Sequence, residues 1–350
     1  MRGSTRAMLA VTGALIATAA GGATGGAATP TVAYDNFNKP GYSLDDYYAK
    51  WSNPYGLIEM ESNDTRTFAG KRFNISAVPF TRGADFSVFD HLKYIGVSNA
   101  AFPVPSVGSI TFSADITAST PGTVAGLTQH GLFGAPFSWV DPFVPPAEPD
   151  YHASVLQGQQ AGVVLNMVDF CTGQLFDWFL AEDTAFPLIE RLPTNVTGNT
   201  DNPNCPGATY VGRELMYTQI IKELPIQPGV AHKVEIRYTR KRNNAVVDYF
   251  LDGTRVARVD NVGIPLDVQG VPFVTYPSLG HGELLYDEIS SFSIGHGLFS
   301  LLDAFPYQHP EAPELSVSIP VGPGPAGSAR LFGQGASGSF DNFNVTTQSG

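Results

Sequence analysis

The feature that most constrains the fold is a strict alternation of apolar and polar residues in many short runs. In 109–117, for example, Ile, Phe and Ala alternate with Ser, Thr and Asp. A period of two places every second side chain on the same face of a strand. With 37 Gly and 27 Pro residues to form turns, the pattern predicts an all-β protein of antiparallel strands.

Thirteen runs satisfy this pattern, at 57–62, 72–78, 94–98, 109–117, 162–169, 174–180, 185–192, 215–224, 232–239, 245–251, 254–260, 289–294 and 337–346. Asp252-Gly253 between two of them predicts a tight hairpin, because both residues tolerate the positive φ angles of such a turn. Residues 298–305 are the one segment where we expect a short turn or helix.

Charge and composition narrow the possible partners. The 350-residue chain is 43% hydrophobic and 15% charged, which is typical of a folded protein. It has 20 basic against 32 acidic residues, a net charge of -12. Binding to phosphates needs clustered Lys and Arg, so we expect neither nucleic acid nor a membrane surface as partner.

The N-terminal segment resembles a secretory leader. Arg2 and Arg6 precede the apolar stretch 7–20, and a run of small residues follows to Ala33. Cleavage after Ala20 or after Ala33 would suit these residues, and the alternative is a disordered Gly/Ala tail. We expect 1–33 to be the leader and 34–350 a single domain with long loops, secreted or in the lumen of the secretory pathway.

The cysteines and the glycosylation motifs agree with that route. Cys171 and Cys205 are the only cysteines, and in an oxidising compartment they are expected to form a disulfide, with two buried thiols as the alternative. Four Asn-x-Ser/Thr motifs for N-glycosylation begin at Asn63, Asn74, Asn195 and Asn344.

A short internal repeat connects the two ends of the domain. Residues 34–38, YDNFN, resemble 340–344, FDNFN. We expect both segments to be edge strands that pair, with Phe37 and Phe343 in the core. Asp35 and Asp341 could ligate calcium through oxygen, but capping of strand ends and turns is the favoured alternative.

Three segments resemble the concanavalin A-like lectin/glucanase superfamily. The run 232–238, HKVEIRY, is followed by a hairpin at 247–256, VDYFLDGTRV, and the chain closes with 339–345, SFDNFNV. The resemblance implies a jelly-roll β-sandwich of two antiparallel sheets, one of them concave, and says little about activity. Residues 176–193 are similar to an uncharacterised secreted subgroup of that superfamily.

The resemblance also implies where a glycoside hydrolase of this fold would carry its carboxylates. Such enzymes have Glu-x-Asp-x-x-Glu or Glu-x-Asp-x-Glu on one strand, whereas this chain has Glu59-Met60-Glu61 followed by Asp64. Glu59 and Glu61 would share one face about 7 Å apart, where they could share a proton or divide acid and base roles. The alternative is a solvent-facing acidic pair.

The other candidate residues are polar positions of neighbouring strands. If these strands form one curved sheet, its face holds Glu59, Glu61, Arg72, Asn166, Tyr217 and Gln219, with Asp177 and His281 as further ligand contacts and Trp139 and Trp178 as aromatic walls. Each has the alternative of an ordinary strand-surface residue. We expect no metal and no cofactor, because no metal-ligand spacing of His and no phosphate-binding or dinucleotide motif occurs.

Three classes of function remain open. The first is an enzyme that binds an apolar, terpenoid- or polyketide-like substrate in the sandwich groove and promotes a cyclisation or cycloaddition, such as a hetero-Diels–Alder reaction. The second is a secreted glycan-binding or glycan-processing protein. The third is a structural surface protein. The size, leader and subgroup give a fainter resemblance to hetero-Diels–Alderases of fungal natural-product clusters.

An enzyme of the first class would act mainly by holding its reactants close together and in the right orientation. Glu61 would be the acid–base residue and Glu59 its partner. Arg72, Tyr217 or Gln219 would donate a hydrogen bond to a developing oxyanion.

Overall fold

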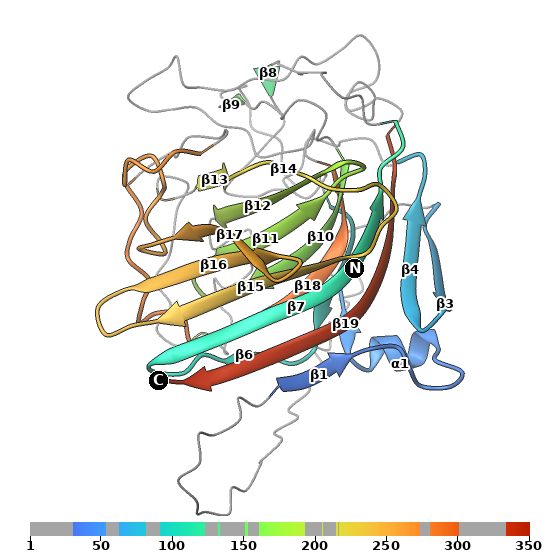
Figure 1. The fold of residues 1–350 in the computed structure, drawn as a ribbon, viewed down its shortest axis with the longest axis horizontal. Helices are drawn as coiled ribbons and strands as arrows, with labels where there is room; N and C mark the ends of the chain where they lie inside the picture. Colours follow the sequence, from blue (N-terminus) through green and yellow to red (C-terminus); the bar gives the residue numbers. More distant parts are fainter. Residues whose placement is uncertain are drawn as a thin grey trace, which may run out of the picture.

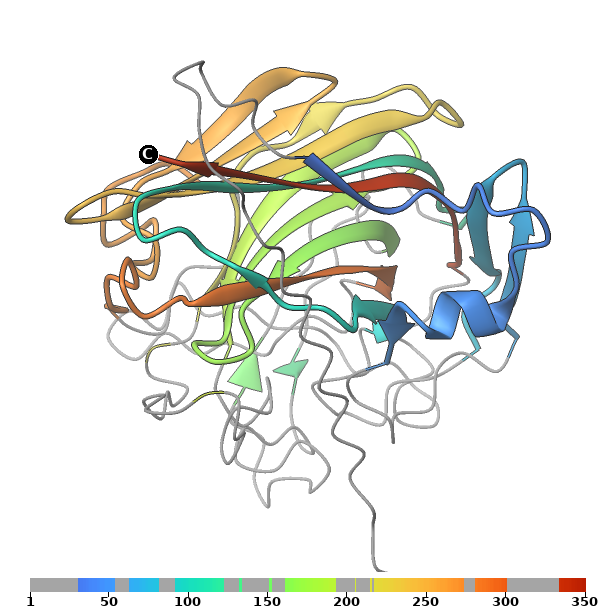
Figure 2. The ribbon, with the colours of Figure 1, turned by 90° about the horizontal axis from the view of Figure 1, so that it is seen from below.

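The protein is a β-sandwich of two stacked antiparallel sheets (Figures 1 and 2). The structure is a computed structural model, and it describes residues 31–53, 63–81, 92–122, 132–133, 151–152, 161–192, 205, 215, 217–273, 281–300 and 334–350. These residues form strands β1 to β19 and one short helix, α1. The predicted all-β, jelly-roll-like fold is confirmed.

Sheet A has eight strands in the order β17-β16-β15-β7-β19-β4-β3, with β1 paired to β19 beside this path. The strands are β1 (Thr31–Asp35), β3 (Thr65–Ala69), β4 (Arg72–Ala77), β7 (Gly108–Ser119), β15 (His232–Arg240), β16 (Ala245–Leu251), β17 (Thr254–Val259) and β19 (Ala336–Ser349). The predicted hairpin joins β16 to β17, and both Asp252 and Gly253 have positive φ angles there.

Sheet B has nine strands in the order β13-β12-β11-β10-β18-β5-β2, with β14 paired to β12 and β6 to β18. Its strands are β2 (Trp51–Ser52), β5 (Leu92–Ser98), β6 (Phe102–Pro103), β10 (Ala161–Val168), β11 (Gln174–Leu180), β12 (Thr184–Arg191), β13 (Tyr217–Ile220), β14 (Leu224–Pro225) and β18 (Ser291–Ser300). A separate pair is formed by β8 (Leu132–Phe133) and β9 (Tyr151–His152).

The hydrophobic core lies between the two sheets. Sheet A contributes alternate residues such as Phe112 and Ile236, and sheet B contributes Leu165, Phe176 and Ile189, all fully buried. Burying these apolar side chains stabilises the sandwich. Because a shift of one residue would turn a whole strand over, the alternation also fixes which face of each strand looks inward.

The two ends of the described chain close the sandwich by pairing, as the repeated sequence predicts. In the antiparallel pair of β1 and β19, Thr31 lies opposite Thr346 and Asp35 opposite Phe343. The rings of Phe37 and Phe343 are both buried, with centroids 6.1 Å apart. Thr31–Ala33 belong to β1, so cleavage after Ala20 would keep all the pairs of β1 with β19, whereas cleavage after Ala33 would remove those of Thr31, Val32 and Ala33.

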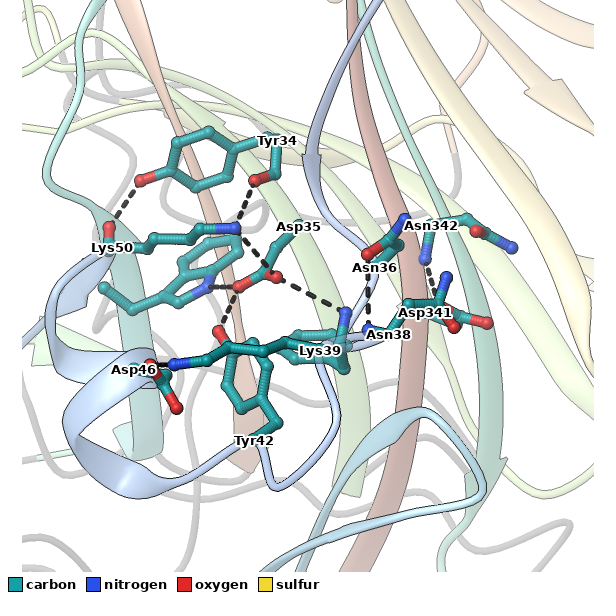
Figure 3. A network of polar contacts seen from close by, with 12 residues as sticks. Tyr34, Asp35, Asn36, Asn38, Lys39, Tyr42, Asp46, Lys50, Asp341 and Asn342 are labelled. Atoms are coloured by element: carbon teal, nitrogen blue, oxygen red, sulfur yellow. Dashed lines mark hydrogen bonds and ion pairs between the residues drawn. The ribbon is translucent and has the colours of Figure 1, made fainter.

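Asp35 holds the end of β1 to the segment that follows it (Figure 3). Its buried carboxylate accepts hydrogen bonds from the Tyr42 hydroxyl at 2.6 Å and Trp51 Nε1 at 2.9 Å, and Lys50 Nζ lies 3.1 Å away. At the other end, Asp341 Oδ1 accepts from the Asn342 backbone amide at 2.7 Å. Both aspartates thus bind protein donors, in line with the capping alternative.

Helix α1 (Leu44–Tyr48) was not expected from periodicity because it is only five residues long. Its signal is local instead. Ser43 accepts a hydrogen bond from the Asp46 backbone amide, and the Asp46 side chain accepts one from the Ser43 amide, which is a capping box. The helix buries Tyr47 against the core.

The predicted turn or helix at 298–305 is wrong for its first three residues. Leu298–Ser300 continue β18, where Leu298 pairs with Val163. The predicted strand 57–62 and residues 301–305 lie outside the described residues. Among the residues that are described, no helix is long and apolar enough to span a membrane.

Candidate acid–base site on sheet B

A line of polar side chains crosses sheet B on the face turned away from sheet A, which we call the outer face of sheet B. The line consists of Asn166 on β10, Asp177 on β11, Glu190 on β12 and Thr218 on β13. Their chain neighbours, such as Leu165, point into the core. Because successive side chains of a strand alternate between faces, the polar residues must point outward.

The strand register brings these four residues together. Asn166 lies directly opposite Asp177, and Asn166 Nδ2 donates to Asp177 Oδ1 at 2.6 Å. Glu190 lies directly opposite Thr218, whose hydroxyl donates to Glu190 Oε1 at 3.1 Å. Asp177 is opposite Leu188, two residues from Glu190. The two acids are therefore diagonal neighbours, a relation that spans roughly 7–8 Å.

Both carboxyl groups are buried, at 1% exposure for Asp177 and 8% for Glu190. Burial raises the pKa of Asp177 to about 7, against the opposing effect of the hydrogen bond from Asn166. Burial also raises the pKa of Glu190 well above its usual value, and the charge of Asp177 raises it further. Near neutral pH such a pair holds a proton that belongs to the pair and not to either residue.

Apolar side chains surround this polar line on the same face. Phe179 lies 5.2 Å from Phe186 in a stacked arrangement and 5.7 Å from Phe299 in an edge-on one, measured between ring centroids. Each of two rings lies over a glycine of the sheet. A Cβ added to Gly162 would lie 2.9 Å from the Phe179 ring, and one added to Gly297 would lie 2.6 Å from the Phe299 ring. The glycines therefore make room for the phenylalanine rings.

Asn166 has one buried polar atom with no partner. Its Oδ1 forms no hydrogen bond, although the side chain is 2% exposed. Gly295 lies next to this oxygen on the neighbouring strand β18, and a Cβ added to Gly295 would lie 3.3 Å from it. An unpaired buried acceptor costs stability, so Asn166 Oδ1 is a position where a ligand donor would be favourable.

The structure corrects the predicted grouping of the site residues. Arg72 lies on β4 in sheet A, so it is not on the same sheet as Asn166. Trp178 lies in the core and donates from Nε1 to the Glu235 carbonyl of sheet A at 3.1 Å. It is therefore a core residue and not the wall of an open groove on this face.

Tyr217 and Gln219 also point to the inner side of sheet B, opposite to Asn166. The Tyr217 hydroxyl donates to Gln174 Oε1 at 2.9 Å. Gln219 Oε1 accepts from the Leu266 amide at 2.6 Å and so holds the loop after β17. The prediction of one shared face failed because each strand's pattern gives two faces but does not say which one looks inward.

Several predicted residues lie elsewhere. His281 is exposed in the segment before β18. Of the glycosylation motifs, Asn74 and Asn344 lie on the outward side of sheet A, and Asn63 Nδ2 donates to the Pro79 carbonyl at 2.6 Å. The residues Glu59, Glu61, Trp139 and Asn195 lie outside the described residues, so their roles stay predictions.

Glu190 was the functional candidate that the sequence reasoning did not select. Its signal was present in 184–191, TAFPLIER, where an acid follows a mainly apolar run. An acid in a strand with mainly apolar residues on both faces is expected to be buried and therefore paired or protonated. Asp177 between Phe176 and Trp178 shows the same signal.

The predicted disulfide between Cys171 and Cys205 is confirmed, with a Cα–Cα distance of 5.4 Å. It begins at the turn between β10 and β11, where buried Asp169 accepts from the Cys171 amide at 3.0 Å and the Thr172 hydroxyl at 2.6 Å. Burial raises the pKa of Asp169 to about 6. Disulfides are typical of extracellular or secretory compartments.

Comparison with known proteins identifies a family. A family model described as "Family of unknown function (DUF6081)" matches residues 147–349, which include all strands of the candidate site. The chain belongs to this family. No curated protein matches it. The matched region thus includes β10 to β13 and β18, and the description of the family gives no activity.

Solved structures similar to this family member are β-sandwiches. An endo-1,3-beta-glucanase from Streptomyces sioyaensis has 11% identity and a TM-score of 0.40, over 95% of this chain and 100% of that one. A legume lectin-like domain from Entamoeba histolytica has 8% identity and a TM-score of 0.35, over 91% and 98%. These likenesses concern the fold alone.

Proposed function

We propose that the protein is an enzyme that binds a small, largely apolar molecule against the outer face of sheet B and uses Asp177 and Glu190 as its acid and base. The observation that carries this proposal is the pair of buried carboxyl groups with raised pKa values. Titratable groups perturbed in this way are frequent in active sites because proton transfer near neutral pH requires them.

The surroundings of the pair support an apolar substrate. Phe179, Phe186 and Phe299 form one side of the face, and Val164 and Leu188 lie next to the polar line, all buried. Sites for small molecules commonly combine an apolar lining with few, well-placed polar groups. Here the polar groups are the two acids, the Thr218 hydroxyl and the unpaired Asn166 Oδ1.

The chemistry that this pair suits is loss of water followed by a cycloaddition. From an o-hydroxybenzyl alcohol, the protonated carboxyl group would donate its proton to the benzylic hydroxyl, which leaves as water. The ionised carboxylate would accept the phenolic proton, so an o-quinone methide forms and the pair keeps one proton in total. The o-quinone methide would then add to an alkene in a hetero-Diels–Alder reaction, favoured by proximity.

The test uses the disulfide-bonded full chain with salicyl alcohol and α-humulene as probes. The cyclic ether product is measured by mass spectrometry over time. We expect D177N and E190Q to lower the rate by about 100-fold or more, as for loss of a general acid or base. D183N is the matched control, because Asp183 is an exposed acid in the turn just before β12.

Two results would contradict the proposal. If the wild-type protein forms the product no faster than buffer, the reaction class is wrong. If D177N and E190Q keep the wild-type rate, the assignment of the two acids is wrong.

A further inference from the structure

A shallow groove of about 350 Å³ lies on the outward side of sheet A, on the opposite sheet from Asp177 and Glu190. Its floor is made by β3, β4, β19 and β7, and Gly229 in the turn before β15 lies at its border. Figure 1 shows that β3 and β4 run at an angle to the long part of β7.

The floor carries two parallel rows of uncharged polar side chains. In the first row Thr65, Ser76, Ser337 and Ser119 stand opposite one another on four neighbouring strands. The Ser76 and Ser337 hydroxyls are 2.6 Å apart and hydrogen-bonded. Adjacent strands of a sheet are about 4.8 Å apart, so the row repeats a hydroxyl group at about that interval.

The second row lies two residues further along each strand. It consists of Thr67, Asn74, Ser339 and Thr117. Two residues of a strand span about 6.7 Å, so the rows are separated by about that distance. Thr67 is exposed, and the other three side chains are partly exposed.

Charged side chains begin directly beside this neutral area. The next row along the same strands contains Arg72, Asp341 and Asp115, and Lys233 of β15 lies opposite Asp115. A solvated sheet face typically carries charged residues, as this one does outside the groove. The groove itself is lined by hydroxyl, amide and small side chains, and at its β7 end the Ser119 hydroxyl donates to Glu182 Oε2 at 3.1 Å. This lining complements a ligand that is polar but has no charge.

We propose that this groove binds a chain of neutral sugars laid along a row, across the strands. Hydroxyl groups both donate and accept hydrogen bonds, so a repeating polyol ligand can match a repeating row of Ser and Thr. A sugar ring in an extended chain is about as long as the strand spacing of roughly 4.8 Å, so successive sugars can meet successive strands. This site is separate from the acid–base site and does not depend on it.

The test is isothermal titration calorimetry of the full chain with cellohexaose, laminarihexaose and maltohexaose. The protein is produced without N-glycosylation, because Asn74 belongs to the motif Asn74-Ile75-Ser76. We expect at least one hexaose to bind and the T67V/T117V variant to bind it at least about tenfold more weakly, from the loss of two hydrogen bonds. Val keeps the shape and the strand preference of Thr.

Two variants serve as controls. T239V changes a threonine on the same side of sheet A but outside the groove, and D177N changes the acid–base site. Both should bind the hexaose as the wild type does. The proposal is overturned if no hexaose binds, if T67V/T117V binds with unchanged affinity, if D177N abolishes binding, or if charged hexagalacturonate binds as tightly as the neutral sugars.

Discussion

Asp177 and Glu190 make the stability of this protein depend on pH in a defined direction. Their pKa values in the folded chain are raised above the ordinary values of 3.8 and 4.5. The folded state therefore binds their protons more tightly than the unfolded state does. The contribution of Asp177 to stability is fully present below about pH 4 and is lost as the pH rises through about 7. The contribution of Glu190 has the same sign, because its pKa is also raised in the folded chain.

Replacing Asp177 by Asn should remove much of this dependence. We expect the difference in unfolding free energy between D177N and wild type to shift in favour of D177N by about 2–4 kcal/mol between pH 4 and pH 8. Urea unfolding at several pH values measures this shift. Burial also raises the pKa of Asp169 and lowers the pKa of His296 in the folded chain. Both residues are present in D177N and in the wild type, so their contributions cancel in the difference between the two proteins.

A difference that stays constant with pH would contradict the raised pKa of Asp177. The same experiment on D183N provides the control, since Asp183 is an exposed acid that does not belong to the buried pair.

At the residue scale, the sequence allowed us to name Asn166 and Asp177 but not to group them correctly. Each sits between apolar neighbours, which already suggested a special environment. Whether Tyr217 shares their face depends on the pairing between β12 and β13, where Tyr217 lies opposite Arg191 and Thr218 opposite Glu190. That register comes from contacts between distant segments, and no local pattern contains it.

At the element scale, the position of β1, which pairs with β19 and so joins the two ends of the domain, depends on the Asp35 carboxylate. Asp35 receives hydrogen bonds from Tyr42 and Trp51 and pairs with Lys50 (Figure 3). Removing it leaves the buried Trp51 Nε1 without its acceptor. We expect D35A to lower the unfolding free energy by about 2–4 kcal/mol, measured by urea unfolding at one pH.

D45A is the matched control, because Asp45 is an exposed aspartate on α1. It should cost no more than about 1 kcal/mol through the helix dipole. Equal stability of D35A and wild type would show that the network does not hold β1 in place.

The long strands could be predicted from the sequence, whereas the short elements could not. Residues 245–251 were placed without error, and 232–239 fall one residue short of β15. Seven to nine residues suffice to show a period of two. The two-residue strands β2 and β6 are too short to show a period, and they form by pairing with the longer strands β5 and β18. The five-residue α1 is also too short, and its signal is the capping box of Ser43 and Asp46.

At the scale of the whole molecule, the two sheets share one core and present chemically different outward faces. Sheet A shows rows of hydroxyl groups and scattered charges, whereas sheet B presents buried acids among phenylalanines. Composition and the resemblance to concanavalin-like proteins predicted this layered fold. They could not predict which sheet carries the acids, because that depends on strand order, in which β10 is adjacent to β18.

The most direct test of the account is carbon-13 NMR of the side-chain carboxyl carbons across pH, with Asp177 and Glu190 assigned through D177N and E190Q. We predict that Asp177 titrates near pH 7 in the wild type. We also predict that the Glu190 midpoint is lower in D177N, because the charge of Asp177 raises it. Titration of both groups near pH 4, each unaffected by the loss of the other, would contradict a shared proton on the outer face of sheet B.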